Sequence, residues 1–519
     1  MPILPTLPVT RTYRDMTDTF AGYDHNLKIP DGSFFDTENL TTEFYPLLAT
    51  RRKRGWVKNL FGPGGLIDKV YLAYIDEGIL YLNDSPTALT GLTGGDKQLV
   101  GFGAYICIFP DKKYYNTADP TDYGDMAEDP DDIPEMDFVI ECKNRLWGCK
   151  YGVVNGQNIN EIYACELGNF ANWTEFEGIS TDPYTASVGS DGPWTGAINY
   201  MGYPTFFKED RIHRVAVSAI GAHEITETVC DGVQAGSHGS LQVVNGLLYY
   251  KTNTGIVVYQ GGTAPTPISA QLGDVKYSGA VAGVLDRKYY VSMLSDSGSW
   301  HLFCYDSTRG LWMREDGTHA KYFATVGNEL YMLNDRNEIW ALNGTTGEPE
   351  ETVDWYAESG TLYYAYPDHK YVSRFDIRLD MEAGARIRVL IDYNSEGRWM
   401  RQGEIIMRGM NSKVIPVRPR RCDHCRIRIE GWGPAKIRYA LMMKGIAREI
   451  AAAALEEIDA DAAVAKLEKL VAAKYRTLKG DPYEKFKLIK YALSRGYDYN
   501  EVAPVVERIL MQSLSDENQ

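Results

Sequence analysis

Residues 328–342 read NELYMLNDRNEIWAL, and this stretch decides the fold class. An aromatic-rich apolar run, Leu330–Leu333, ends at the polar residues Asn334–Asn337, and a second apolar run follows at Ile339–Leu342. Two short apolar runs on either side of a polar turn are typical of a β-hairpin. The stretch therefore predicts two antiparallel strands.

The same phrase recurs along the chain at a nearly constant interval. Its aromatic anchors Phe207, Tyr249, Tyr290 and Tyr331 are spaced by 42, 41 and 41 residues, and we expect Ile79–Leu82 to be a degenerate earlier copy. A period of ~40 residues built from short strands and turns is that of a β-propeller blade. Because one blade alone exposes a hydrophobic face, several blades must close into a ring. The spacing predicts a mainly β, propeller-like domain over 69–352 with five to seven blades; an array of β-sandwiches with coincidental spacing stays open.

Residues 353–433 follow a different pattern. The stretches Ser373–Asp380, Arg386–Asp392 and Arg426–Glu430 alternate apolar and charged residues. Strict alternation with charge on one face indicates half-exposed antiparallel strands. We therefore expect a small β-sandwich after the ring, and an extended segment over 1–68 before it.

The net charge is unevenly distributed. The 519 residues carry a formal charge of −16, but the 14 Lys and Arg and 13 Asp and Glu from Pro434 onward leave −17 on the body that precedes them. An acidic body excludes non-specific attraction to phosphate, which needs clustered Lys and Arg. No apolar run approaches the ~18–20 residues that span a bilayer, and the N-terminus lacks a signal-peptide pattern. We expect a cytoplasmic protein with no membrane partner, or one packaged into a virion.

Catalytic and metal-binding patterns are weak in the body. It contains no P-loop, no G-x-S-x-G and no H-E-x-x-H, and its histidines are scattered. Cys422–Cys425 is a lone C-x-x-C without the second ligand pair of a structural zinc site, so we expect reduced thiols in or beside a strand. Asp119–Asp137 holds nine carboxylates without the ligand order of an EF-hand, which favours a solvated loop over a calcium site. The sequence predicts no enzyme, no metal and no cofactor.

The N-terminal segment resembles a known family. Asp31–Leu40 (DGSFFDTENL) runs into Tyr45–Gly55 (YPLLATRRKRG), which is similar to the start of tailed-phage stabilisation or tail-accessory proteins, and Pro419–His424 (PRRCDH) resembles their closing sandwich. The resemblance implies a structural role at a head–tail or tail junction, with other virion proteins or further copies in a ring as partners. It makes a basic run a docking contact, although a solvated turn is an equal alternative: Arg51, Arg52, Lys53 and Arg54.

After Pro434 the apolar period changes from two residues to 3.6, which indicates helices. Proline is tolerated in a first helical turn, and Gly445 and Gly496 fit C-cap positions. Lys436–Leu441 (KIRYAL) and Leu488–Leu493 (LIKYAL) are nearly identical phrases 52 residues apart. We therefore expect an all-α tail of three-helix repeats over 434–519.

These phrases resemble the RecX family of RecA regulators, whose modules are tandem three-helix repeats. Lys436–Ile446 (KIRYALMMKGI), Ala454–Asp459 (ALEEID) and Lys487–Tyr497 (KLIKYALSRGY) match three family phrases in order. The resemblance omits the first module and the opening helix of the second. It implies binding to the RecA filament, with nucleic acid reached through RecA or the tail. The candidate contacts, which are equally consistent with a solvated face, are Lys436, Arg438, Lys444, Lys487, Lys490 and Arg495.

Two functions stay open at this point. In the first, the chain is a structural virion protein and the tail is a passenger. In the second, the tail regulates RecA, recombination and DNA repair, and the body is a scaffold. The boundary is expected near Gly433, where residues 431–437 fit both the last strand of the body and the start of a RecX helix.

Overall fold

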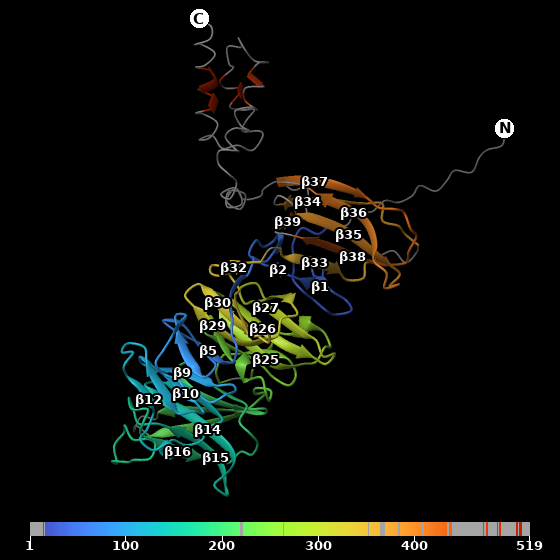
Figure 1. Cartoon of the computed structure of the whole chain (residues 1–519). Helices are drawn as coiled ribbons and strands as arrows, with labels where there is room; N and C mark the ends of the chain where they lie inside the picture. The colour runs from blue at the N-terminus through green and yellow to red at the C-terminus, as the bar shows by residue number, and fades with distance from the viewer. Residues whose placement is uncertain are drawn as a thin grey trace, which may run out of the picture. The chain divides into compact units, whose positions relative to one another are not determined.

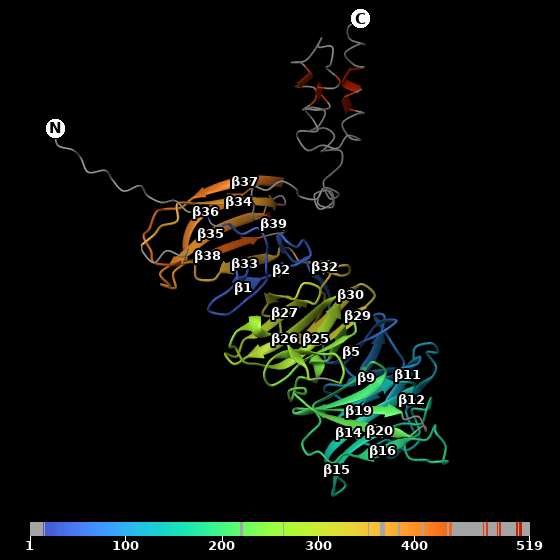
Figure 2. The same cartoon turned by 180° about the vertical axis from the view of Figure 1, so that it is seen from behind.

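The computed structural model describes residues 14, 16–217, 222–262, 264–350, 352–363, 369–381, 385–406, 409–432 and 435–438, together with separate helical residues of the tail. Two compact units divide the chain, Met1–Leu441 and Met442–Gln519, and each is described by itself. Figure 1 traces the chain from blue to red, and Figure 2 shows it from behind.

Seven antiparallel sheets follow one another in the described part of the first unit. The first three sheets are β5 (Pro63–Lys69), β6 (Tyr71–Asp76), β7 (Ile79–Leu82) and β8 (Ser85–Pro86); β9 (Gln98–Phe102), β10 (Tyr105–Phe109), β11 (Lys113–Asn116) and β12 (Tyr123–Asp125); and β13 (Phe138–Cys142), β14 (Arg145–Val154), β15 (Gln157–Ala164) and β16 (Tyr184–Ser187). The next three are β17 (Gly196–Tyr200), β18 (Tyr203–Lys208), β19 (Arg211–Val217) and β20 (His223–Val229); β21 (Gln242–Val244), β22 (Leu247–Lys251), β23 (Ile256–Tyr259) and β24 (Thr266–Pro267); and β25 (Tyr277–Leu285), β26 (Lys288–Ser295), β27 (Trp300–Asp306) and β28 (Leu311–Asp316). Short 3-10 helices lie between sheets at η1 (Pro130–Asp132), η2 (His238–Ser240) and η3 (Ala270–Leu272).

The seventh sheet closes the ring with a strand from the beginning of the chain. It contains β29 (Ala320–Val326), β30 (Glu329–Asn334), β31 (Glu338–Ala341), β4 (Gly55–Asn59) and β32 (Glu348–Pro349), in that order. The first strand β29 lies against β25 of the sixth sheet and β5 of the first. Buried Leu66 and Tyr74 of the first sheet share one core with Leu333 and Ile339 of the seventh. These contacts make a seven-bladed propeller, because every blade buries its apolar faces against two neighbours.

The predicted repeat is the blade. Phe207, Tyr249, Tyr290 and Tyr331 lie in β18, β22, β26 and β30, the second strands of four consecutive blades, so their spacing is the blade length. Ile79–Leu82 is β7, the third strand of the first blade. The mainly β prediction is confirmed.

A second β structure in the same unit consists of two five-stranded sheets. One has the order β1-β33-β38-β35-β36 and the other β2-β3-β39-β34-β37. Their strands are β1 (Phe34–Glu38), β2 (Leu40–Thr41), β3 (Leu48–Thr50), β33 (Asp354–Ser359), β34 (Arg374–Met381), β35 (Arg386–Tyr393), β36 (Met400–Ile406), β37 (Gly409–Pro416), β38 (Cys425–Trp432) and β39 (Ala435–Arg438). The predicted alternation is confirmed, since Ile377, Leu379 and Ile387 are buried between charged neighbours of the same strands.

Residues 1–68 differ from the separate extended segment that the sequence predicts. In the described residues, β1, β2 and β3 belong to the sandwich, whereas β4 and β5 belong to the propeller. Figure 1 shows blue β1 and β2 beside the orange strands of the C-terminal half. The backbone N–H of Tyr23 donates to the Trp312 carbonyl (2.7 Å), and that of Asn39 donates to the Glu315 carbonyl (2.7 Å). This segment therefore covers the outer edge of β28, which an isolated blade would leave unpaired.

The helix predicted to start at Pro434 is wrong for Ala435–Arg438, which form β39. This strand pairs Ile437 with Leu48 of β3 and with Leu379 of β34, so it lies inside a sheet. Paired strands on both sides satisfy its backbone polar groups, and this tertiary effect outweighs a local helical pattern. The first compact unit accordingly extends to Leu441 rather than to Gly433.

Cys422 and Cys425 lie where the sequence places them, beside and at the start of a strand. Both are buried thiols outside any disulfide, and burial raises the pKa of Cys422 above its ordinary value. Their neighbours include Tyr393 and Val417, which belong to the same apolar cluster. No group of three or more metal-ligating side chains occurs among the residues that the structure describes.

In the second unit, the described residues are helical at 471, 474–475, 485, 487–488, 505–506 and 508–510. Val471, Leu488, Val505 and Val506 are buried together, with Tyr475, Ile509 and Leu510 packed against them. These residues form a small apolar core within the tail.

Candidate functional site

The basic run between β3 and β4 was predicted as a docking contact, and for two of its members that prediction is wrong. Arg54 is 4% exposed, and its guanidinium pairs with Glu315 and Asp316 at 2.6 Å each. Burial opposes the charge, but the carboxylates of Asp316 and Glu315 outweigh it and raise the pKa of Arg54. The same guanidinium holds the pKa of Asp316 below its ordinary value, against the effect of burial.

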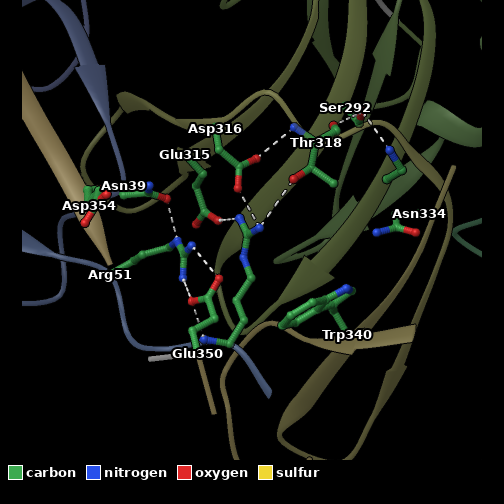
Figure 3. A network of polar contacts seen from close by, with 12 residues as sticks. Asn39, Arg51, Ser292, Glu315, Asp316, Thr318, Asn334, Trp340, Glu350 and Asp354 are labelled. Atoms are coloured by element: carbon green, nitrogen blue, oxygen red, sulfur yellow. Dashed lines mark hydrogen bonds and ion pairs between the residues drawn. The ribbon is translucent and has the colours of Figure 1, made fainter. Parts of the chain in front are cut away.

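Arg51 lies beside this pair and is also buried (Figure 3). Its guanidinium pairs with Glu350 at 2.7 Å and donates through Nε to Oδ1 of Asn39 at 2.6 Å. Asn39 in turn donates to the Asp354 carbonyl at 2.7 Å. Figure 3 shows Arg51 between Asn39 and Glu350, with Glu315 and Asp316 alongside. The network ties the N-terminal segment to blade six and to the sandwich, and an outside partner does not reach it.

The other two members of the run point outward to different degrees. Arg52 has a 58% exposed side chain and pairs with Glu43, and Lys53 is half-buried. Burial along the run therefore does not alternate, since both ends are buried and the two middle residues are more exposed. Of the four predicted docking residues, Arg52 is therefore the most exposed.

The predicted RecA or DNA contacts are divided between the two units. The backbones of Lys436 and Arg438 belong to β39 and pair with Asp380 and Arg378 of β34. Lys487 is helical and exposed, next to buried Leu488 of the tail core. Lys444, Lys490 and Arg495 lie outside the described residues. The structure therefore places Lys487 on a helical surface of the second unit, and it places Lys436 and Arg438 in one strand of the first.

No sequence pattern indicates a buried polar cluster between the third and fourth blades. Lys208 is 1% exposed, and its Nζ donates to the Ser190 carbonyl (2.6 Å) and to Oδ1 of Asn160 (3.2 Å). The ammonium also lies 4.6 Å from the ring centre of Trp194. Burial lowers the pKa of Lys208, because the charged form loses hydration. The members come from different blades, so their spacing in the sequence carries no signal.

His213 lies in the same cluster, and its geometry does not make a nucleophile. Its Nε2 is 2.9 Å from Oγ of Ser190 and 3.1 Å from Oε2 of Glu227. A serine–histidine–carboxylate site needs the serine and the carboxylate on opposite ring nitrogens. Both contacts share Nε2 here, and the ring is fully buried. The cluster therefore stabilises the contact between blades.

No helix among the described residues is long and apolar enough to cross a membrane. The polar clusters around Arg54 and Lys208 belong to the interior of the body.

The comparisons identify the C-terminal part. Residues 424–455 match the family model described as RecX, second three-helix domain. The C-terminal part of the chain is similar to RecX. Over 86 residues the chain is 35% identical to the regulatory protein RecX of Clostridium perfringens strain 13, and over 86 residues it is 34% identical to that of strain SM101. The match covers 16% of this chain and 41% of each relative, so the chain spans about two fifths of the length of the curated RecX proteins.

The beginning of the RecX match overlaps the sandwich. Cys425–Trp432 is β38 and Ala435–Arg438 is β39, so in this chain those residues are strands where the family has a three-helix domain. The alternation of β38 buries Ile429 against the core that it shares with β33 and β35. The rest of the matched segment, residues 439–455, lies outside the described residues.

Solved structures resemble the body only distantly. The N-terminal domain of Nup159 has a TM-score of 0.31 at 10% identity, covering 63% of this chain and 96% of that one. Hsv2p of Kluyveromyces lactis has a TM-score of 0.31 at 9% identity, covering 60% and 98%. At these TM-scores the seven-bladed ring rests on the strand pairing of the seven sheets and not on the likeness.

Proposed function

We propose that this chain is a non-enzymatic binding protein whose RecX-like tail binds the RecA filament and modulates recombination and DNA repair. The observation that supports this most is the match of the C-terminal segment to RecX, in a family model and in two curated proteins. The tail has its own apolar core, which gives it a surface on which contacts can be presented. The body then acts as a rigid scaffold in the cytoplasm.

The proposed contacts are the basic residues that follow the sandwich. Lys436 and Arg438 are held in β39, so the proposal rests on Lys444, Lys487, Lys490 and Arg495. Lys487 is exposed beside the tail core, as a contact to a filament requires. Exposed Lys and Arg attract the acidic groups of a partner and steer its association.

The test adds the purified full-length chain to RecA on single-stranded DNA and measures ATP hydrolysis and strand exchange. We expect the chain to slow both, and the variant Lys487→Glu/Lys490→Glu/Arg495→Glu to lose at least ~10-fold in potency, since reversed charges cost several kcal/mol at an interface. The matched control, Lys28→Glu/Arg287→Glu/Arg336→Glu, reverses three exposed cations of the body and retains the effect. No change in RecA activity at saturating wild-type chain would contradict the proposal.

A structural role in a phage-type virion is the second proposed function. It is supported by the placement of the phrases that resemble tail-accessory proteins. Asp31–Leu40 includes β1, and Tyr45–Gly55 includes β3 and the first residue of β4, so these residues join the sandwich to the ring. Negative-stain electron microscopy of the same purified chain distinguishes the two functions. Closed rings of several copies favour the virion role, and single particles that inhibit RecA favour the first proposal.

A further inference from the structure

The positive charge of the body is concentrated in the sandwich. Residues 353–433 contain 14 Lys and Arg against 11 Asp and Glu, a balance of +3, whereas residues 1–352 contain 26 against 46, a balance of −20. The average charge of the body therefore hides a basic region. At 0.15 M salt the Debye length is ~8 Å, so the local charge decides which partners approach the sandwich.

Two loops form one end of the sandwich, which we call the arginine end and define as residues 394–401 and 417–424. Arg420 pairs with Glu396 across the loops, and its Nη1 lies 3.4 Å from Sδ of Met400. The backbone N–H of Asp423 donates to Oδ1 of Asn394 at 2.9 Å, and Oγ of Ser395 is 2.8 Å from Nε2 of His424. These bonds hold the two loops side by side.

Three cations at the arginine end are exposed and have no carboxylate partner among the described residues. The two loops contain five arginines and two carboxylates, a balance of +3. Arg420 and Arg401 pair with Glu396 and Glu404. No ion pair joins the other three to any residue within the described ranges, and all three are exposed: Arg398, Arg418 and Arg421. Exposed guanidinium groups without a carboxylate partner are suited to phosphate, which they bind through two parallel hydrogen bonds.

Exposed aromatic rings adjoin these cations. Tyr363 is 57% exposed and Tyr371 is 50% exposed. The ring of Tyr363 lies 5.4 Å from that of His424, and β-bridges join Leu362 to Cys425 and Lys370 to Cys422. Both tyrosines are therefore anchored next to the loop 417–424. Open aromatic faces beside a basic surface are what single-stranded nucleic acid uses, because its phosphates pair with cations while its bases stack.

We propose that the arginine end, with Tyr363 and Tyr371, binds single-stranded nucleic acid. The exposed rings favour this partner over an acidic protein surface, which needs the cations but has no bases to stack. The inference concerns the body and does not depend on RecA binding by the tail.

Fluorescence anisotropy of a labelled 20-nucleotide oligothymidylate with the full-length chain tests this inference. We expect Arg398→Ala/Arg418→Ala/Arg421→Ala to weaken binding by ~10- to 100-fold at 0.1 M salt, and to reduce the slope of log Kobs against log salt by about 2. We expect Tyr371→Leu to weaken it by about 5- to 150-fold, the range for loss of one stacked base. The control Lys28→Ala/Arg287→Ala/Arg336→Ala removes the same charge from exposed positions of the first unit outside this end and leaves affinity unchanged.

Two results would overturn the inference. Equal affinity of the arginine variant and wild type would assign any binding to another part of the chain. The second result comes from sedimentation velocity of the protein alone. If the wild type self-associates, and the arginine variant abolishes self-association but leaves oligonucleotide binding unchanged, the arginine end is a contact for an acidic protein surface. Thermal unfolding of each variant is the folding control. A Tm equal to that of the wild type shows that the two loops, which other residues hold together, have kept their fold.

Discussion

At the scale of single residues, Arg54 joins segments 261 positions apart in the sequence, from the start of β4 to the end of β28. Removing one partner of a buried ion pair leaves an unpaired charge in the interior, which costs about 3–5 kcal/mol. We therefore expect Arg54→Met to lower the free energy of unfolding by that amount, measured by urea denaturation. Arg52→Met, at an exposed pair, is the control, and we expect it to change stability by less than ~1 kcal/mol. Similar losses of unfolding free energy in both variants would contradict a stabilising role for the buried Arg54 ion pairs.

At the scale of elements, β4 closes the propeller, and Gly55 at its start allows the close approach of another segment. A Cβ at this position would lie 1.8 Å from the Thr346 carbonyl oxygen, which is backbone and cannot move aside cheaply. We expect Gly55→Ala to cost about 1–3 kcal/mol, the range for overpacking, and to speed hydrogen exchange at the amides of β4. Gly189→Ala is the matched control, because a Cβ added at Gly189 would meet no described atom within 4 Å. Unchanged exchange in β4 would show that the strand is not held by this contact.

At the scale of the whole molecule, histidines with a buried ring nitrogen predict how stability depends on pH. The Nδ1 atoms of His213, His223 and His301 are buried without a partner among the described residues, and burial lowers the pKa of each ring. The unfolded chain binds protons near pH 6.5, whereas the folded rings do so only at lower pH. Stability is therefore full above pH 6.5 and is lost as the pH falls toward the folded values. Differential scanning calorimetry should give a lower Tm at pH 5.5 than at pH 7.5, and an equal or higher Tm at pH 5.5 would be inconsistent with neutral buried rings.

Local patterns predicted those elements whose partners are near in sequence. The hairpin phrases around Tyr249, Tyr290 and Tyr331 lie in blades, because each strand pairs with the next one along the chain. The alternation of apolar and charged residues at Arg374–Met381 was likewise sufficient to predict a strand, since one face of the strand is buried and the other is not. The RecX-like phrases predicted the similarity of the C-terminal part to RecX, because they are specific runs of residues rather than a period.

Local sequence patterns could not predict contacts between residues that are far apart in the sequence. The run at Arg51–Arg54 has the composition of a surface turn, and only the fold brings Glu315 and Glu350 to it. Ala435–Arg438 has a local helical pattern, but pairing with β3 and β34 makes it a strand. The arginine end is likewise a product of the fold, since Arg398 and Arg421 belong to different loops that hydrogen bonds hold together.

By itself, the sequence determined that this protein has a repeated β body and a RecX-like tail, because the blade period and the tail phrases are written in neighbouring residues. Only the tertiary structure decided that the ring has seven blades, that a strand from the beginning of the chain closes it, and that β39 belongs to the sandwich. The physical reason is that closure and sheet membership depend on which backbone groups and apolar faces meet after folding. Those partners lie tens to hundreds of residues apart, where no local period can specify them.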